Sequence, residues 1–230
     1  MGVGELKDGH LKGVLVTAIG IEGCRELFSG ARPVTYPAKR TIFAEGEPGG
    51  SLILIEDGRV EISNTSLMGR KSVLAYMGPG EVLGEIAALD GGPRSADAVA
   101  ATKVEALALS RDNVLEYISA RPDFAQSVIV ELCSKVRNAS RMFATQSIIE
   151  GEPRLARGLL QLFDKWGTNH TDGIALAERF SQQDIGEFSG LARENVNRQI
   201  KAWVQSGVLR NEGRTLVLVD RDALEYLAEL

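Results

Sequence analysis

The sequence contains few of the residues that build metal, haem or disulfide sites. It has two cysteines, Cys24 and Cys133, two histidines, His10 and His170, and no CxxC pair. These numbers exclude a tetracysteine iron–sulfur cluster and a zinc ribbon. They indicate free thiols in a reducing compartment, and we expect no metal cofactor.

Long apolar runs and a strong basic charge are also missing. No stretch of about 18 apolar residues occurs, so the sequence predicts no membrane span. No basic segment followed by an apolar run marks a signal peptide. We therefore expect a cytoplasmic protein with no membrane partner. The net charge is −5, so binding to nucleic acid requires a local basic patch.

A chain of 230 residues with 44% hydrophobic content predicts two domains. In its first half, short β-prone runs alternate with glycine-containing turns. The runs are 41–43, 51–55, 59–62, 72–75, 95–100 and 104–109. Many short strands separated by such turns predict an antiparallel barrel or sandwich. Asp57-Gly58 predicts a hairpin between two of these strands.

From Ser110 onward the pattern becomes helical. Ser110 can cap one helix, and Pro122 begins a longer one that extends to about Ile149 without internal proline or glycine. Apolar residues recur along it at three- and four-residue steps, which favours a coiled coil with a second subunit. Packing against the chain's own barrel is the alternative. We expect a dimer interface that comprises Ile129, Leu132, Val136, Ala139 and Phe143.

Residues 80–96 carry the groups best suited to bind a ligand. Glu85 can accept a hydrogen bond from a ribose hydroxyl, and Arg94 offers forked donors for a phosphate. Ser95 and nearby backbone N–H groups add neutral donors. The segment therefore predicts a site that holds a sugar and a phosphate together. The alternative is a surface Glu–Arg pair, which contributes at most about 1 kcal/mol.

This segment, with Gly84-Glu85 followed by Pro93-Arg94-Ser95-Ala96, resembles the phosphate-binding cassette of cyclic-nucleotide-binding domains. It is most similar to the cyclic AMP receptor branch of the CRP/FNR regulators. The resemblance implies that Glu85 binds the ribose 2′-hydroxyl and that Arg94 and Ser95 bind the cyclic phosphate. The full set of expected ligand contacts is Gly84, Glu85, Ile86, Ala87, Arg94, Ser95, Ala96, Asn138 and Ser140.

The chain departs from this family at the purine-binding positions of the long helix. Where the family presents a threonine and then a serine, this chain has Ala139 and Ser140. Asn138 or Ser140 can contact either purine, or both can be polar positions on the flank of a coiled coil. The resemblance therefore implies cAMP or cGMP as the ligand, with the choice left open.

Residues 181–206 predict a helix-turn-helix. Ser181 suits an N-cap, with Asp184 in a capping-box position, and Ser189-Gly190-Leu191 supplies the turn. The second helix directs Val196, Ile200 and either Trp203 or Val204 inward. Between residues 192 and 205 it carries three basic side chains and one acidic side chain, a net of +2. Such a helix would lie in the major groove.

Residues 208–210 and 215–219 predict a β-hairpin wing whose tip contacts phosphate. Arg193-Glu194 followed by Arg198 is similar to the recognition-helix signature of the same family. The resemblance implies that the arginines bind guanine, that the glutamate accepts from cytosine, and that a TGTGA-like half-site is repeated as an inverted pair. The expected DNA-binding residues are Ser181, Gln182, Arg193, Glu194, Asn197, Arg198, Lys201 and Arg214.

The combined expectation is an α+β fold. Residues 1–115 form a jelly-roll (double-stranded β-helix) cyclic-nucleotide-binding domain with N-terminal helices, 116–150 a long dimerisation helix, and 151–230 a winged helix-turn-helix. The expected function is a homodimeric transcription regulator that binds palindromic double-stranded DNA under the control of cAMP or cGMP. RNA polymerase is a further candidate partner.

Two alternatives stay open. One is a ligand-independent or redox-responsive regulator of the same family. The other is the regulatory subunit of an enzyme controlled by a cyclic nucleotide. The chain itself has no nucleophile elbow, HExxH motif or Walker loop, so we expect no enzymatic activity.

Overall fold

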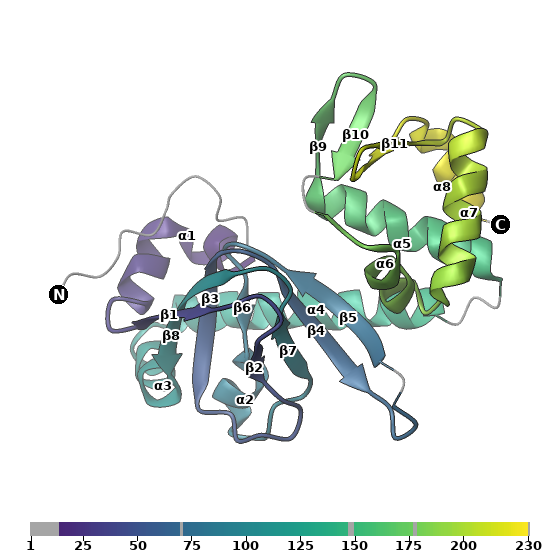
Figure 1. Ribbon diagram of the computed structural model, residues 1–230. Helices are drawn as coiled ribbons and strands as arrows, with labels where there is room; N and C mark the ends of the chain where they lie inside the picture. The colour runs from purple at the N-terminus through teal and green to yellow at the C-terminus, as the bar shows by residue number, and fades with distance from the viewer. Residues whose placement is uncertain (1–13, 70, 147–149, 177–178, 230) are drawn as a thin grey trace. The chain divides into compact units, whose positions relative to one another are not determined.

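The computed structural model describes residues 14–69, 71–146, 150–176 and 179–229. The chain forms two compact units, one of residues 1–70 with 74–138 and one of residues 71–73 with 139–230 (Figure 1). No helix among the described residues is both long enough and apolar enough to cross a bilayer.

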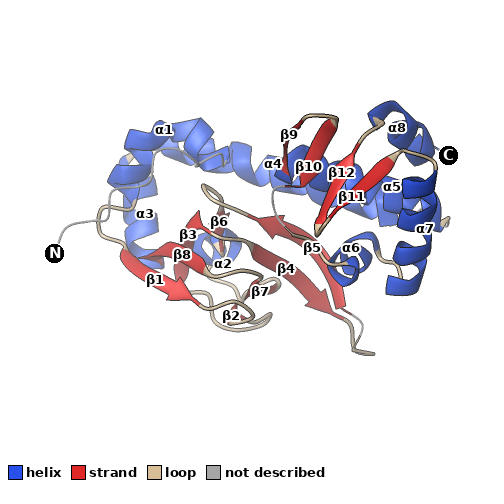
Figure 2. Ribbon diagram, turned by 45° about the horizontal axis from the view of Figure 1, so that its top comes forward, coloured by secondary structure: helices blue, strands red, loops and turns tan. Residues whose placement is uncertain are grey.

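The first unit is built around a β-roll. Its elements, through the long helix that continues into the second unit, are α1 (Val14–Leu27), β1 (Arg32–Tyr36), β2 (Thr41–Phe43), β3 (Ser51–Asp57), β4 (Val60–Thr65), β5 (Lys71–Met77), β6 (Val82–Leu83), α2 (Glu85–Asp90), β7 (Asp97–Ala100), β8 (Val104–Ser110), α3 (Arg111–Ala120) and α4 (Pro122–Gln146). The strands form two four-stranded sheets, in the orders β1-β8-β3-β6 and β2-β7-β4-β5 (Figure 2). This arrangement confirms the predicted jelly-roll class.

Strand β3 is buried on both faces. Leu52 and Leu54 pack into a core that includes Phe28 of the segment after α1, Val114 of α3 and Phe124 of α4. The intervening Ile53 and Ile55 point into the interior of the roll. Successive side chains of a strand point to opposite faces, so burial of both faces explains why residues 52–55 are apolar without interruption.

Both predicted helix starts in this region are confirmed. Helix α3 follows Ser110, whose hydroxyl accepts a hydrogen bond from the Asn113 N–H at 3.3 Å. Helix α4 begins at Pro122 and its described part ends at Gln146. The rest of the predicted helix, up to Ile149, lies outside the described residues.

The prediction that Asp57-Gly58 closes a β-hairpin is wrong. Strand β3 pairs with β8 and β6, whereas β4 lies in the other sheet beside β7 and β5. Gly58 has a φ of +89°, and a Cβ atom there would lie 2.1 Å from the carbonyl oxygen of Lys103. The turn is a corner at which the chain passes from one sheet to the other, and a close backbone contact requires glycine there.

The second unit has the architecture of a winged helix-turn-helix. Its elements are α5 (Gly151–Trp166), β9 (Gly167–His170), β10 (Gly173–Leu176), α6 (Gln182–Ser189), α7 (Arg193–Gln205), β11 (Leu209–Glu212), β12 (Thr215–Leu218) and α8 (Arg221–Glu229). The four strands form one sheet in the order β11-β12-β10-β9. The wing predicted from residues 208–219 is confirmed as β11–β12, whereas the β9–β10 hairpin was not predicted.

Helix α8 is part of the fold of the second unit. Leu224 is fully buried, and Arg157 of α5 donates from Nε to the Ala228 carbonyl at 2.7 Å. Arg221 joins α8 to α5 through Asp164 at 2.8 Å. The final helix therefore packs against α5.

We predict that Gly58→Ala destabilises the first unit more than Gly69→Ala. Both glycines have positive φ, of +89° and +74°, but a Cβ atom at Gly69 would meet nothing within 4 Å. Gly69→Ala should lower the free energy of unfolding by about 1–2 kcal/mol, through left-handed backbone strain alone. Gly58→Ala should lower it by about 1–3 kcal/mol more, because the new methyl group collides with backbone atoms. Urea unfolding of both variants measures the difference, and equal losses would contradict the account of the sheet-switching corner.

Candidate ligand and nucleic-acid sites

The side chain of Arg94 is buried beside the turn that leads from β6 into α2. It is 5% exposed. One terminal nitrogen donates to the carbonyl oxygen of Gly84 at 3.1 Å, and the other donates to the Ser51 hydroxyl at 3.1 Å. Its guanidinium carbon lies 4.2 Å from the centre of the Phe43 ring. The charged group is thus held by two neutral oxygens and an aromatic face.

Gly84 is required at this turn for two reasons. It has a φ of +75° as the N-cap of α2, and a Cβ atom would lie 1.9 Å from a terminal nitrogen of Arg94. A side chain at position 84 would therefore displace the guanidinium and strain the backbone. The sequence pattern placed Gly84 and Arg94 in one site, and the structure brings them into contact.

The guanidinium of Arg94 has no carboxylate in direct contact among the described residues. Burial lowers the pKa of the guanidinium, and the negative charges of Glu85 and Glu47 oppose that effect. No ion pair between Arg94 and a carboxylate occurs among the described residues, and the Nε atom is buried without a hydrogen-bond partner. Buried cations normally have a paired anion, so the arrangement suits an external anion such as a phosphate.

Glu85 begins α2, directly after the residue whose carbonyl oxygen binds Arg94. Glu85 also borders a shallow apolar hollow that opens to solvent. The other residues that line the hollow are Leu52, Val82, Ala88, Leu89, Val114, Phe124, Val128 and Leu132. Arg94 is not among them, so Glu85 stands between the anion-binding group and an apolar space bordered by α4.

The remaining expected ligand contacts have different environments. Ala87 and Ala96 are buried, whereas Ile86 and Ser95 are exposed. Asn138 and Ser140 are both exposed on α4. Asn138 follows the last α4 residue of the hollow, Leu132, by six positions, which is about 9 Å along a helix. No described contact joins Asn138 to Arg94 or Glu85.

In the second unit, the predicted capping box of the helix-turn-helix is confirmed. The Ser181 hydroxyl accepts from the Asp184 N–H at 3.1 Å, and the Asp184 carboxylate accepts from the Ser181 N–H at 2.7 Å. Gly190 has a φ of +67° and ends α6. The Gly186 carbonyl accepts from the N–H groups of both Gly190 and Leu191, which closes the turn before α7.

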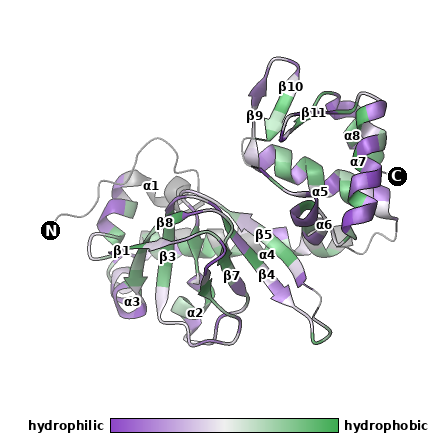
Figure 3. Ribbon diagram, in the orientation of Figure 1, coloured by the Kyte–Doolittle hydropathy of each residue, from purple (hydrophilic) through white to green (hydrophobic). Residues whose placement is uncertain are grey.

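Helix α7 has one buried face and one polar, exposed face. Val196, Ile200 and Trp203 are at most 4% exposed, so Trp203 fills the inward position that the sequence left open between Trp203 and Val204. The exposed residues include Arg193, Glu194, Arg198 and Lys201. In Figure 3 the helix is correspondingly rich in the colours of hydrophilic residues.

Amide side chains hold Arg198 and Asn197 of α7 in place. Asn195 accepts from a terminal nitrogen of Arg198 at 3.1 Å. Asn197 accepts from the Gln182 amide of α6 at 3.3 Å. Arg214 is exposed in the turn of the wing. No sequence motif marks Asn195, because an intrahelical contact that restrains an arginine has no distinctive pattern.

Glu152 of α5 holds the C-terminal half of α7 in place. Its carboxylate accepts from the Gln199 amide at 2.7 Å and from the Trp203 indole N–H at 3.2 Å. Within the described part of the chain, no group of three or more histidine, cysteine or acidic side chains is arranged to hold a metal ion. Two regions stand out chemically, the surroundings of the buried Arg94 and the polar face of α7.

Comparisons with known proteins match both units. The family model described as "Cyclic nucleotide-binding domain" matches residues 33–121, and the "Crp-like helix-turn-helix domain" matches residues 153–227. The CRP-like cAMP-activated global transcriptional regulator of Mycobacterium tuberculosis is 32% identical over 193 residues, which are 84% of this chain and 86% of the relative. The cyclic AMP receptor protein of Thermus thermophilus is 33% identical over 193 residues, which are again 84% of this chain and 86% of the relative.

A solved structure agrees at the level of the fold. FixK2 from Bradyrhizobium japonicum has a TM-score of 0.76 at 24% identity, and the match covers 86% of this chain and 96% of FixK2. The two curated relatives above are a transcriptional regulator and a nucleotide receptor rather than enzymes. The chain belongs to the CRP/FNR family and is a CRP-like transcription regulator with a cyclic-nucleotide-binding domain and a DNA-binding domain.

Proposed function

We propose that the protein is a homodimeric transcription regulator whose binding to DNA is switched by cAMP or cGMP. The observation that carries this proposal is the buried guanidinium of Arg94, which no carboxylate contacts directly among the described residues. A cyclic phosphate supplies a negative charge that the guanidinium lacks as a direct partner. The activation by cAMP named for the Mycobacterium tuberculosis relative supports the same ligand class.

In this proposal the ligand is held along the turn from β6 to α2. Arg94 and the exposed Ser95 bind the phosphate, together with backbone groups of Gly84 and Ala96. Glu85 accepts from the ribose 2′-hydroxyl. Ile86 and Ala87, in the first turn of α2, form the adjoining wall.

The purine is proposed to contact α4 through Asn138 or Ser140, which are both exposed polar residues. Such a contact favours one position of α4 in each subunit over the others. The ligand then shifts the protein toward the state that it binds more tightly. The gating therefore depends on a contact with α4 and not on the phosphate alone.

DNA binding is proposed to use the exposed face of α7. Arg193 and Arg198 donate to guanine, and Glu194 accepts from cytosine. Asn197 lies on the same helix, close to the groove. The phosphate contacts are assigned to Ser181, Gln182, Lys201 and Arg214. Two copies related by a two-fold axis would read an inverted pair of TGTGA-like half-sites in successive major grooves, about 34 Å apart.

The dimer is proposed to form through the exposed side of α4. Ile129, Val136 and Phe143 are 60%, 65% and 77% exposed and recur every seven residues. A seven-residue apolar repeat is the pattern of two supercoiled helices. Ala139 is exposed on the same helix, whereas Leu132 is half-buried and lines the apolar hollow, so it would lie on the flank of the interface.

Arg94→Gln should weaken cyclic nucleotide binding about 100-fold. Each hydrogen bond to a charged group contributes about 1.5–3 kcal/mol, and Gln cannot supply the guanidinium fork. Isothermal titration of the purified protein with cAMP and with cGMP measures the loss. Arg32→Gln, which removes an exposed arginine on β1, should bind as tightly as the wild type.

The gating is tested in the same samples with operator DNA. Wild-type protein should bind the inverted repeat more tightly when the nucleotide is present. Equal affinity with and without bound nucleotide would refute gating. Failure to bind either nucleotide would favour the ligand-independent regulator.

Arg198→Ala should reduce discrimination between operator sequences by about 1–3 kcal/mol at the guanine it contacts. Arg214→Ala should instead weaken binding to all sequences and lower the slope of log K against log salt by about one. Fluorescence anisotropy with single-base operator variants at several salt concentrations separates the two effects. A uniform loss in Arg198→Ala would assign that residue to phosphate rather than to base recognition.

Val136→Glu should dissociate the dimer because it places two like charges opposite each other in an apolar seam. Sedimentation equilibrium should show a monomer, while Val219→Glu, at a residue that is 39% exposed in the second unit, should remain dimeric.

Cys133 is exposed between Ile129 and Val136 on the helix. Oxidative cross-linking of wild-type protein should therefore join two copies, and a Cys133→Ser variant should stay uncross-linked. A dimeric Val136→Glu variant would place the interface elsewhere.

A further inference from the structure

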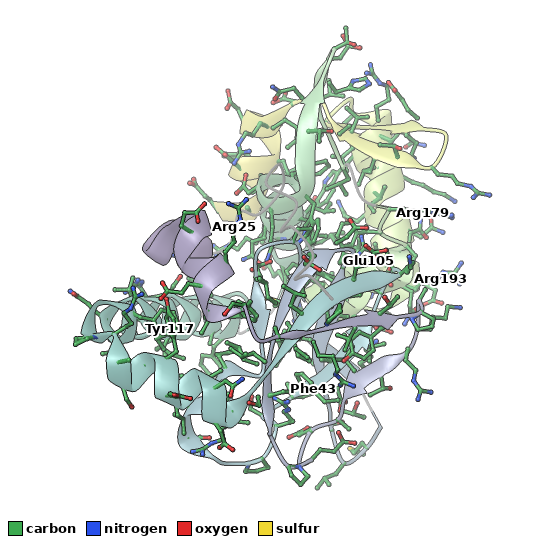
Figure 4. All side chains as sticks on the ribbon, turned by 90° about the vertical axis from the view of Figure 1, so that its left-hand side faces the viewer. Arg25, Phe43, Glu105, Tyr117, Arg179 and Arg193 are labelled. Carbon is green, nitrogen blue, oxygen red and sulfur yellow. The ribbon has the colours of Figure 1, made fainter. Side chains whose placement is uncertain are left out.

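Residues that are distant in sequence from the ligand-binding motif determine the position of Arg94. All of them belong to the segment 43–51, which comprises the end of β2, the following loop and the start of β3. Phe43, labelled in Figure 4, closes β2. Ser51, 43 positions before Arg94, opens β3.

The loop between these two residues fixes the backbone of Arg94 from both sides. The Arg94 N–H donates to the Glu47 carbonyl at 2.8 Å, and the Arg94 carbonyl accepts from the Gly46 N–H at 2.9 Å. Pro48 and Pro93 form an isolated bridge next to these bonds. The backbone of Arg94 therefore cannot shift without breaking two hydrogen bonds to the 43–51 segment.

The side chain is held by a second set of contacts from the same segment. The Phe43 ring lies 4.2 Å from the guanidinium carbon, and the Ser51 hydroxyl is 3.1 Å from a terminal nitrogen. A π-face binds a guanidinium without using its N–H groups. Phe43 therefore leaves the donors of Arg94 available, and Ser51 occupies one nitrogen with an acceptor that has no charge.

The nearby carboxylate of Glu47 does not take the place of these neutral groups. Its oxygen accepts from the Ala44 N–H at 3.1 Å, so the side chain caps its own loop. An ion pair with Glu47 would compete with a phosphate for the guanidinium, whereas a hydroxyl and a ring compete far less. The segment thus holds the arginine in place and leaves its charge available to bind an anion.

We propose that Phe43 and Ser51 are positioning residues that preset the Arg94 guanidinium for the phosphate of the ligand. The inference rests on the proposed function, because it assigns Arg94 to a cyclic phosphate. Preorganisation raises affinity because the immobilisation of a long side chain is completed before the ligand arrives. Removal of either contact should therefore weaken any ligand that has the phosphate, independently of its base.

Ser51 offers a matched pair of variants. Ser51→Thr keeps the hydroxyl, Ser51→Val replaces it with a methyl group of the same shape, and both β-branched residues are favoured at the start of a strand. We expect Ser51→Val to weaken cAMP and cGMP equally, by about 10-fold, as befits one hydrogen bond to a charged group. Ser51→Thr should bind within about threefold of wild type.

Phe43 offers a second pair, Phe43→Leu and Phe43→Tyr. Leucine keeps most of the apolar volume in the roll but has no π-face, whereas tyrosine keeps the ring. Phe43→Leu should weaken binding by about 3- to 30-fold, the range for an arginine that loses a partly buried aromatic partner. Phe43→Tyr should bind close to wild type.

A readout in the absence of ligand distinguishes positioning from general destabilisation. Nitrogen-15 NMR of the ligand-free protein reports rotation of the Arg94 guanidinium, assigned by the signal lost in Arg94→Lys. Wild type, Ser51→Thr and Phe43→Tyr should show slow rotation, and Ser51→Val and Phe43→Leu should show fast rotation. In an Arg94→Lys background, Ser51→Val should weaken nucleotide binding less than twofold further. The Ser51 hydroxyl orients a planar guanidinium, and a lysine ammonium has no such plane to orient.

The outcomes separate this inference from the proposed function. Unchanged guanidinium rotation in Ser51→Val and Phe43→Leu would overturn the inference, even if nucleotides bind. A full 10-fold loss from Ser51→Val in the Arg94→Lys background would also overturn it, because the effect would not act through the arginine. Faster rotation in a protein that binds neither nucleotide would uphold the positioning of Arg94 and refute the proposed ligand.

Discussion

The structure around the ligand site depends on one buried positive charge. Arg94 is 5% exposed and has no carboxylate in direct contact among the described residues, so its burial is offset by neutral dipoles, an aromatic face and the more distant charges of Glu85 and Glu47. This requirement explains why position 84 is glycine, since any side chain would occupy the space of the guanidinium. It also explains the polar Ser51 at the start of β3, which is otherwise apolar through residue 55. A domain that only needed stability would have replaced such a charge with an apolar side chain.

Most of the architecture follows from local sequence signals. The short β-prone runs correspond to β2, β3, β4, β5, β7 and β8, and the starts of α3, α4 and α6 follow their capping residues or Pro122. The sequence did not reveal β1, β6, β9 or β10. Strand β1 is mostly exposed, β6 has only two residues, and β9 and β10 have four each, so none carries enough apolar alternation to be distinguished from a loop.

The error at Asp57-Gly58 has a specific cause. A glycine turn between two β-prone runs predicts that the runs pair with each other. In a jelly-roll, consecutive strands often belong to opposite sheets, and here the turn packs against residues 102–103, where the Arg59 N–H donates to the Thr102 hydroxyl at 2.8 Å. Pairing partners are set by contacts about 45 residues away in sequence, which a local pattern cannot encode. The same limitation concealed Phe43 and Ser51, whereas Gly84, Glu85 and Arg94 were found because they lie in one contiguous motif.

Binding and gating place different demands on this fold. The contacts of the Arg94 side chain come from β2, β3 and the N-cap of α2, all of which lie in the first unit. A ligand that touched only these elements would bind two states of the protein equally well and would shift no equilibrium, however tightly it bound. Helix α4 contributes residues 122–138 to the first unit and 139–146 to the second. In the proposed mechanism, the phosphate contacts therefore set how tightly the ligand binds, while the contacts with α4 set how strongly binding is coupled to DNA recognition. The positions on α4 that are proposed to contact the purine are where this chain departs from the family pattern, so in that mechanism changes there alter ligand choice and coupling while the Arg94 site stays the same.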